Sequence, residues 1–322
     1  MDVPLDIVWF DDQRSRDIAL VGGKAASLSR LASGHRVPPG FCLTTAAYDA
    51  WSRTARPAHR QAGSPLPQSL RAALRDAYAE LGRRCGADPL RVAVRSSAID
   101  EDGVDASFAG QHETFLNIVG VDAVTEALIG CWSSGRSQRA LAYREGSGLD
   151  ANGIHLAVLV QQLVPADAAA VVFSADPVSG RREEVVIDAN FGLGESIVGG
   201  SVTPDAYRVD KRSGAVVDRS IGSKTVMHIP VPGGTREVPV PRPLRAQPAL
   251  TDEQCAACAA LACSLEAEMG HPVDVECAFH DGQLYLLQCR AITRLPSDPN
   301  ETRAPDRHGE HDGTDDRLDA RP

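Results

Sequence analysis

The chain has 322 residues, which is long enough for one large domain or two medium domains with hydrophobic cores. Its composition, 43% hydrophobic and 24% charged, is ordinary for a globular protein, and no apolar run approaches the length of a membrane span. The formal net charge of −10 argues against nucleic acid or an anionic membrane as the main partner. Any phosphate ligand must therefore be met by basic groups that are placed locally.

The first residues and the cysteines indicate the compartment. The start, MDVPLDIVWFDD, is acidic and has no basic segment followed by an apolar one, so no secretory signal is expected. The eight cysteines are scattered along the chain. We therefore expect free thiols in a reducing cytoplasm.

Strands and helices are predicted to alternate irregularly along the chain. Residues 1–55 are predicted as strand, turn, helix, strand and helix, with a break at Gly22-Gly23. Helices are expected over about Gln68–Arg84 and within residues 121–146, and a buried strand is expected over 154–164. Residues 184–211 are predicted as strand, glycine-rich loop and strand, and Pro230 to Pro248 as a proline-rich excursion.

This order of elements favours an α+β chain with two lobes that meet near residues 161–165. We place the N-terminal lobe at residues 1–165 and the C-terminal lobe at 166–296. Residues 297–322 contain almost no apolar side chain, so a disordered acidic tail is expected.

One cysteine cluster permits two interpretations. The stretch TDEQCAACAALACSLEAEMG predicts a helix with Thr251 as N-cap, Gln254 as its capping-box partner and Gly270 as the stop. Cys255 and Cys258 form a CxxC pair, but no second pair completes a four-ligand metal set. Helix packing is favoured over a metal site.

Two stretches suit phosphate. In VGGKAAS, two glycines precede a helix N-terminus and Lys24 adds a positive charge, although the spacing is not that of a Walker A loop. Arg95 lies at the end of an apolar strand, ahead of a loop rich in small residues. The alternatives are a surface lysine after a glycine turn, and an arginine paired with the acids at positions 100–102.

Two further stretches have features that could bind a ligand. VLVQQLVP interrupts a buried strand at Gln161-Gln162, which is suited to hold a purine edge or simply marks a strand that changes faces. NFGLGESIVGG has a Gly-x-Gly but no dinucleotide fingerprint. Its Glu195 is either an acid near phosphates or an ordinary surface group.

The stretch VDVECAFHDGQLYLLQCRAIT predicts a β-hairpin with an unusual polar set. A three-residue loop, His280-Asp281-Gly282, separates the polar from the apolar side chains, whereas a two-residue turn mixes them. Two sets follow from the longer loop. The apolar face would hold Val273, Val275, Cys277, Phe279, Tyr285, Leu287 and Cys289, and the polar face Asp274, Glu276, Gln288 and Arg290.

This polar face is suited to a metal and to phosphate. Glu276 and Gln288 would converge on one Mg²⁺, and Arg290 would contact phosphate with two nitrogens. The alternative is a cluster of surface ion pairs.

Together these stretches resemble the ATP-grasp nucleotide-binding domain of the phosphoenolpyruvate synthase, pyruvate phosphate dikinase and rifampin phosphotransferase family. The matching motifs run in the family's order, from VGGKAASL, VPPGF and VRSSAIDEDGVDASFAGQHETFLN through VLVQQLV, FSADPVSG and IDANFGLGESIVGGSVTPDAY to GSK and the hairpin. Two departures are the reading QCRAI, where the family often has QARPI, and Ala170 or a neighbour, where a glycine is common.

The resemblance implies an α+β ATP-grasp fold with ATP held in the cleft between the lobes. It implies catalytic roles for Lys24, Arg95 and Arg290, which would hold phosphates, and metal binding by Glu276 and Gln288. Gly110 and Thr114 would lie above the triphosphate, Gln161 and Leu163 at the adenine, and Glu195 close to the nucleotide.

The resemblance also implies partners. The family's complete enzymes carry a swivelling domain with a phosphorylated histidine and a separate acceptor domain, and none of the nine histidines here has such a glycine-rich context. We therefore expect an ATP-dependent phosphotransferase subunit that forms AMP and phosphorylates a histidine on a partner protein. The alternatives are a self-sufficient kinase or ligase for a small metabolite, and a non-catalytic ATP-binding protein.

Overall fold

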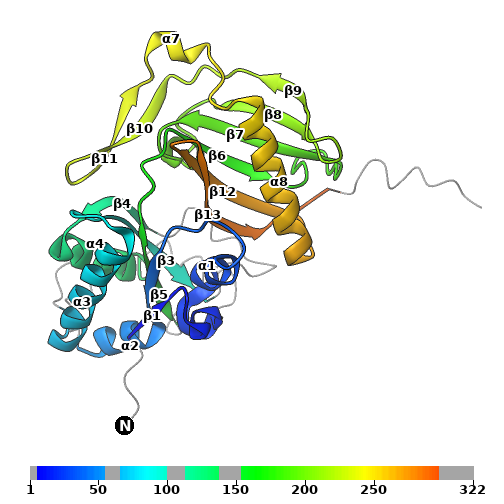
Figure 1. The fold of residues 1–322 in the computed structure, drawn as a ribbon. Helices are drawn as coiled ribbons and strands as arrows, with labels where there is room; N and C mark the ends of the chain where they lie inside the picture. The colour runs from blue at the N-terminus through cyan, green and yellow to red at the C-terminus, as the bar shows by residue number, and fades with distance from the viewer. Residues whose placement is uncertain (1–5, 55–65, 100–112, 138–153, 297–322) are drawn as a thin grey trace, which may run out of the picture.

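The computed structural model describes residues 6–54, 66–99, 113–137 and 154–296, and it has the predicted α+β organisation in two lobes (Figure 1). Gly110 and the tail at 297–322 lie outside the described residues. The lobe boundary placed at residue 165 falls between the last strand of one sheet and the first strand of the next.

The first lobe is built on a five-stranded sheet in which every pair is antiparallel. Its central strand is flanked on both sides and alternates its side chains between two packed faces: Val158 and Val160 meet one cluster, and Ala157 another. The strand order is β1 (Ile7–Trp9), β2 (Gly40–Leu43), β5 (Leu156–Gln162), β3 (Arg91–Ala98) and β4 (Thr114–Val119).

Helices cover both faces of this sheet. One face packs against helices α2 (Thr45–Thr54), α3 (Gln68–Cys85) and α4 (Val121–Ser134). The core on this face includes Tyr48, Trp51 and Trp132. The other face packs against α1 (Ile18–Leu31), which follows the short 3-10 helix η1 (Gln13–Arg16). The helices predicted near Thr45 and over Gln68–Arg84 are therefore confirmed.

The second lobe is built on a six-stranded sheet with antiparallel pairs throughout. Its order is β13 (Gln283–Ala291), β12 (Val273–His280), β6 (Ala168–Phe173), β7 (Glu184–Phe191), β8 (Asp205–Asp210) and β9 (Val216–Ser220). Helix α8 (Asp252–Met269) covers one face, as Figure 1 shows. Leu28 and Leu31 of α1 join the same apolar cluster, so the core is continuous between the lobes.

The cysteine-containing helix forms as predicted. Thr251 accepts from the N–H of Gln254, and the Gln254 side chain accepts from the N–H of Thr251, which completes the capping box. Cys255 and Cys258 are fully buried in the core, and all eight cysteines are free. The neighbouring Cys277 thiol and burial raise the pKa of Cys258, so this thiol packs as an apolar group.

The segment predicted as a proline-rich excursion contains a β-ribbon, so that prediction was wrong. Strands β10 (Val226–Val231) and β11 (Gly234–Pro239) pair antiparallel and are followed by the short helix α7 (Arg242–Arg245). Figure 1 shows the ribbon leaving the second lobe and reaching β4 of the first lobe. Its strands alternate on either side of a Pro-Gly-Gly turn, which is a hairpin signal in the sequence.

The β12–β13 hairpin has a two-residue turn, so the predicted three-residue loop was wrong. His280 pairs with Gln283, and Asp281 and Gly282 both have positive φ, 48° and 72°. This is the backbone of a mirror-image turn, which Asp-Gly favours because its twist matches that of the strands.

A β-bulge restores the polar face that the turn length alone would have split. The register shifts by one residue between Glu276 and Cys277, so that Glu276 faces Gln288 and Asp274 faces Arg290. The core face differs from the prediction, because Leu284 and Leu286 pack in the core, whereas Tyr285 and Leu287 point to the opposite side. The polar and apolar residues are thus separated by a bulge inside strand β13 and not by the length of the turn.

Candidate functional site

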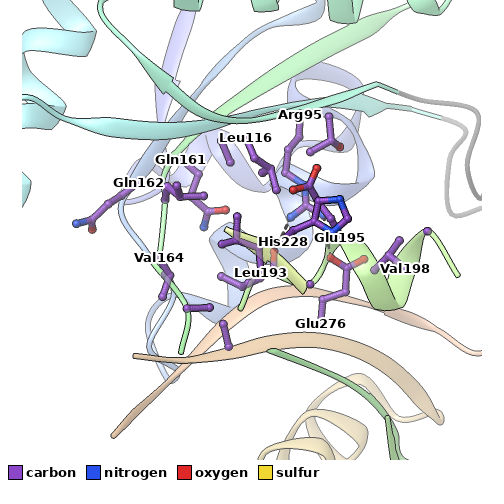
Figure 2. A pocket seen from close by; sticks show the side chains of 18 of the residues that line it. Arg95, Leu116, Gln161, Gln162, Val164, Leu193, Glu195, Val198, His228 and Glu276 are labelled. Carbon is purple, nitrogen blue, oxygen red and sulfur yellow. Dashed lines mark hydrogen bonds and ion pairs between the residues drawn. The ribbon is translucent and has the colours of Figure 1, made fainter. Parts of the chain in front are cut away.

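A cavity of about 460 Å³ lies between the two lobes, and both sheets and the ribbon line it. Figure 2 shows side chains from the two sides pointing into this space. From the first lobe come Ala93, Arg95, Thr114, Leu116 and Gln161, and from the linker, the second lobe and the ribbon come Leu163, Leu193, Glu195, Val198, His228, Glu237, Glu276, Ala278 and Leu287.

Arg95 crosses from the first lobe to the hairpin of the second. Its Nη2 donates to Gln288 Oε1 at 2.6 Å and to Glu276 Oε2 at 3.1 Å, and its Nη1 donates to the Leu287 carbonyl at 3.0 Å. The bulge presents this carbonyl and the Gln288 side chain together. The structure therefore brings three sequence-predicted residues into one cluster at the edge of the cavity.

Three buried polar atoms on the cavity wall have no hydrogen-bond partner among the described residues. They are Arg95 Nε, Glu195 Oε2 and His228 Nδ1. Buried polar atoms are nearly always paired, so a concentration of unpaired ones around a cavity indicates a polar ligand. This set contains both a cationic donor and an anionic acceptor.

Apolar side chains supply the rest of the cavity surface. Ala93, Leu163 and Leu193 form a small buried cluster that joins the lobes, with Leu116 packed against it. Ala278 and Leu287 belong to another such cluster. A flat apolar group such as a purine is suited to this kind of slot.

The first glycine of VGGKAAS allows a close approach within the protein. Gly22 has φ 74°, and a Cβ added there would lie 2.1 Å from the Ser97 carbonyl oxygen. The helix kinks at this residue, and a helical turn precedes the predicted break. Beyond the kink, the N–H of Ala25 donates to Ser97 Oγ at 3.2 Å, so part of the helix N-terminus is already capped.

Lys24 lies beside the Arg95 segment without lining the cavity. Its Nζ donates to the carbonyl of Ser96 at 3.4 Å. The close contact between α1 and β3 thus places the two predicted phosphate-binding cations on adjacent elements. The phosphate role of Lys24 stays a prediction.

Gln161 and Leu163 line the cavity, but some of their polar groups already form hydrogen bonds within the protein. The Gln161 carboxamide donates to the Pro38 carbonyl at 3.0 Å, and the N–H of Leu163 donates to the Arg91 carbonyl at 2.9 Å. Thr114 pairs with Arg95 across β3 and β4 and lines the cavity as well.

Arg290 lies on the polar face of the hairpin but outside the cavity lining. Its Nε and Nη2 donate to Asp274 Oδ2 at 2.9 and 2.7 Å. Burial raises the pKa of Asp274 despite this pairing. The predicted contact of Arg290 with phosphate is not tested by this arrangement.

The oxygens of Glu276 and Gln288 fit a divalent cation. Both lie within hydrogen-bonding distance of a single atom, Arg95 Nη2, so they converge on one point where a positive group is accommodated. A carboxylate and an amide oxygen are ligands that Mg²⁺ accepts in proteins. The donor set therefore suits the predicted metal.

Two cavity residues, His228 and Glu237, were missed by sequence reasoning. They lie opposite each other on the β10–β11 ribbon, within or beside the segment treated as irregular. The alternation HIPV before Pro-Gly-Gly and TREVP after it is the signal that identifies their strands.

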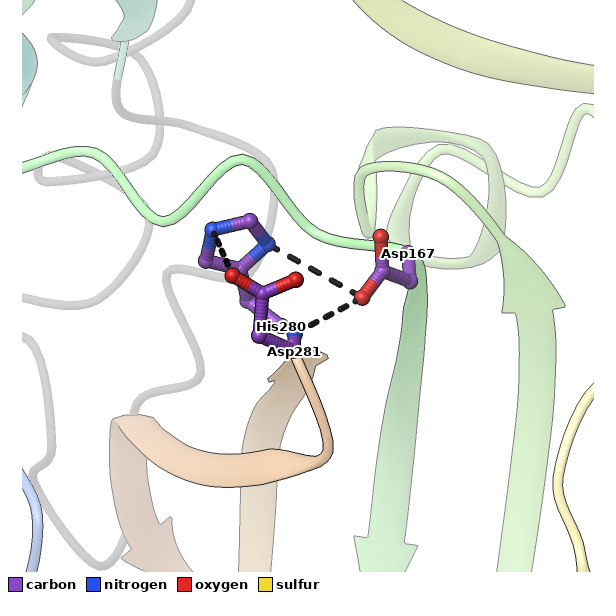
Figure 3. Close-up of side chains that lie close together, drawn as sticks. All are labelled: Asp167, His280 and Asp281. Atoms are coloured by element: carbon purple, nitrogen blue, oxygen red, sulfur yellow. Dashed lines mark hydrogen bonds and ion pairs between the residues drawn. The ribbon is translucent and has the colours of Figure 1, made fainter.

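A separate cluster at the hairpin tip joins Asp167, His280 and Asp281 (Figure 3). The N–H of Asp281 donates to Asp167 Oδ2 at 2.9 Å, and the two carboxylates are 87% and 64% exposed. These contacts fix the turn against the loop before β6, and such exposed acids are common without a metal.

The two lobes and the polar-lined cavity between them define the class of the protein, a two-lobed α+β binding module. The family model of the pyruvate phosphate dikinase AMP/ATP-binding domain matches residues 18–311. The chain therefore belongs to this family, which confirms the predicted resemblance. The α+β, two-lobed architecture is confirmed too, and family membership agrees with the ATP-grasp assignment.

Several curated proteins are similar to the chain. A probable phosphoenolpyruvate synthase of Methanocaldococcus jannaschii is 37% identical over 92% of the chain and 27% of its own length. A rifampicin phosphotransferase of Streptomyces sviceus is 40% identical over 90% of the chain and 36% of its own length. A prodigiosin synthesizing transferase of Serratia marcescens is 37% identical over 90% of the chain and 33% of its own length. The chain thus spans less than half the length of these relatives.

Among solved structures, D-alanyl-alanine synthetase A of Vibrio cholerae aligns with 83% of the chain and 54% of its own, at 13% identity and a TM-score of 0.33. This similarity is too loose to assign any residue. Within the described part of the chain, none of the helices combines the length and the apolar character that a membrane crossing requires.

Proposed function

We propose that the chain is the ATP-binding module of a phosphotransferase that phosphorylates a histidine on a separate swivelling-domain partner and releases AMP. One observation carries the proposal. The cavity between the lobes is lined by buried donor and acceptor atoms that have no partner within the described part of the chain, and it borders the Arg95–Glu276–Gln288 cluster. The family match and the phosphotransferase relatives support the same activity.

In this proposal the phosphates lie at the Arg95 end of the cavity. Arg95, Lys24 and Arg290 neutralise the charge of the phosphates, and Glu276 with Gln288 would hold Mg²⁺. When bound, the metal would neutralise negative charge on the phosphates. Arg95 Nη2 contacts both oxygens that would hold the metal, so Arg95 would have to turn toward the phosphates for the metal to bind there.

The remaining predicted residues hold the nucleotide in place. Gln161 and Leu163 lie on the cavity wall together with the apolar cluster that would receive adenine. Thr114, together with Gly110, would cover the triphosphate. Glu195 Oε2, which has no partner among the residues that the structure describes, would accept a hydrogen bond from the nucleotide.

The proposed transfer requires no nucleophile in this chain. A histidine nitrogen of the partner forms a bond to the β-phosphorus, and the bond between that phosphorus and the α,β-bridging oxygen breaks. AMP leaves with the electron pair, and the histidine receives the β and γ phosphates. The protein contributes positioning and electrostatic stabilisation. The free cysteines support action in a reducing cytoplasm.

The test is product analysis with purified full-length chain, ATP and Mg²⁺, with and without a phosphohistidine-domain protein and acceptor-domain protein. The expected product is AMP, formed only when the histidine protein is present. Formation of ADP with a small-molecule acceptor and no partner would overturn the histidine-transfer proposal.

A Glu276→Gln variant separates an enzyme from a passive ATP-binding protein. We expect it to lose nearly all turnover, because an uncharged amide replaces the carboxylate at the metal. Glu268→Gln, at an exposed position on α8, is the matched control and keeps full turnover. Unchanged turnover in Glu276→Gln would contradict the metal role.

A second candidate is a self-sufficient kinase or ligase that acts on a small metabolite. The similarity to a prodigiosin synthesizing transferase favours keeping it, since that relative is named for small-molecule synthesis. In this case product formation would require the metabolite and no histidine partner.

A further inference from the structure

The β10–β11 ribbon forms a wall of the cavity and is fixed at its inner end. The carbonyl of His228 accepts from the N–H of Leu193 at 2.9 Å. A Cβ added at Gly192, which has φ 72°, would lie 2.4 Å from the same carbonyl oxygen. Glycine is therefore needed at this close approach, and the backbone of His228 has little freedom to move.

Two polar side chains of the ribbon face the cavity from this fixed position. His228 and Glu237 are directly opposite each other in the ladder, so their side chains share one face. Both line the cavity, and His228 Nδ1 is buried without a hydrogen-bond partner among the described residues. An unpaired imidazole nitrogen in this setting points to a ligand group that is able to hydrogen-bond.

The surroundings of His228 indicate which half of the ligand it meets. Its backbone is bonded to Leu193, whose side chain packs with Ala93 and Leu163 in the apolar cluster. The bonds of Arg95, by contrast, run to the β12–β13 hairpin. The ribbon therefore adjoins the apolar part of the cavity, which suits a nucleoside.

The side chain of Asn117, in strand β4, holds the outer end of the ribbon against the first lobe. Asn117 Nδ2 donates to the carbonyls of Val231 and Gly234 at 2.6 and 2.7 Å, on the two sides of the ribbon turn. Asn117 is 2% exposed and has φ 57°, a left-handed conformation that asparagine tolerates better than most residues. It thus holds both strands across the gap between the lobes.

We propose that His228 and Glu237 contact the nucleoside half of the bound nucleotide, through its sugar hydroxyls or base amino group, and that Asn117 is the positioning residue that holds them over the cavity. The inference rests on the proposed function, because it requires that the cavity takes a nucleotide. It adds a specificity element that is independent of the phosphate-binding cluster.

The test compares three ligands by calorimetry on the full chain: ATP, AMP and inorganic tripolyphosphate. His228→Ala is expected to weaken ATP and AMP each by about tenfold, the effect of one lost buried hydrogen bond, and to leave tripolyphosphate unchanged. Arg236→Ala, on the opposite face of the ribbon, is the matched control with unchanged binding. Unchanged AMP affinity in His228→Ala would overturn the inference, as would an equal loss for tripolyphosphate.

Asn117→Gly tests the positioning role while it preserves the left-handed backbone. It should weaken ATP and AMP by about fivefold to tenfold without affecting tripolyphosphate, because the ribbon loses the two hydrogen bonds from Asn117 and the phosphate-binding cluster loses none. In the double variant with His228→Ala the loss should be smaller than the sum of the two single losses, since both changes remove the His228 contact. Additive losses, or equal losses for all three ligands, would contradict the positioning role.

The wild-type chain separates this inference from the proposed function. If it binds neither ATP nor AMP, the proposed function fails as well. If it binds both and the His228→Ala variant binds them equally well, only the role of the ribbon is overturned.

Discussion

The Lys224–Asp205 pair and the Arg95–Glu276 pair each join a cation to a carboxylate, but their surroundings differ. Lys224 and Asp205 are fully buried inside the second lobe. Asp205 also accepts from the N–H groups of Gly222 and Ala249, at 2.8 and 2.7 Å. Arg95 and Glu276 come from different lobes, are 11% and 24% exposed, and border a cavity.

The comparison shows how a structural charge differs from one suited to a ligand. The carboxylate of Asp205 is saturated by protein donors, so nothing further is needed to stabilise it. Arg95 retains a buried Nε that has no hydrogen-bond partner among the described residues. Both lysine and arginine belong to motifs shared with the family, so the motif alone does not tell the two roles apart.

The largest effect is expected at the buried pair. Lys224→Met should lower the free energy of unfolding by about 3–5 kcal/mol, because it leaves the Asp205 charge buried without its cation. Urea denaturation measures this loss. The matched control is Lys211→Met, whose amine pairs with the partly exposed Glu266 and whose loss should cost about 1 kcal/mol or less. Equal losses in the two variants would contradict the structural role of Lys224.

The Arg95–Glu276 pair should show the opposite pattern, a large loss of activity with a small loss of stability. Arg95→Met is expected to slow AMP formation by about 10²–10³-fold, as removal of a preorganised donor does in other enzymes. The free energy of unfolding should change by about 1 kcal/mol or less, because Glu276 remains partly hydrated. Arg84→Met, on the surface of α3, is the control and should keep the full rate. A strongly destabilised Arg95→Met with a normal rate would reverse the comparison.

The hairpin shows what sequence reasoning recovered and what it missed. Sorting polar from apolar residues correctly predicted that Glu276 and Gln288 share a face, because burial penalises mixing. It attributed this to a longer turn, whereas the chain keeps the favoured two-residue Asp-Gly turn and inserts a bulge. A bulge depends on how strand β13 packs against its neighbours, and the alternation of residues does not reveal it.

The rest of the site illustrates the same limit. Arg95, Thr114, Gln161, Leu163, Glu195 and Glu276 were predicted from motifs and do line one cavity. His228 and Glu237 were missed, because prolines masked the alternation of a ribbon that packs across the lobes. The position of Asn117, which joins this ribbon to β4, follows from tertiary contact alone.

The smallest effect is expected at a third charged side chain, Asp176. This carboxylate is buried and accepts several hydrogen bonds from the protein. It accepts from Ser179 Oγ at 2.7 Å, from the N–H of Val178 at 2.9 Å and from Arg208 at 2.8 Å. Burial alone would raise its pKa, but these hydrogen bonds hold the pKa well below the ordinary 3.8. Asp176→Asn should therefore lower the free energy of unfolding by about 1–3 kcal/mol at neutral pH.

The stabilisation by the Asp176 charge should depend on pH. Because the pKa of Asp176 is lower in the folded than in the unfolded chain, its stabilisation is complete above 3.8 and is lost as the pH falls toward the folded pKa. The difference between wild type and Asp176→Asn, measured by urea denaturation, should thus shrink below about pH 3.8. A difference that stays constant between neutral and acidic pH would mean that the side chain acts through its shape. Asp176 would then stabilise its turn without contributing its charge, unlike Asp205.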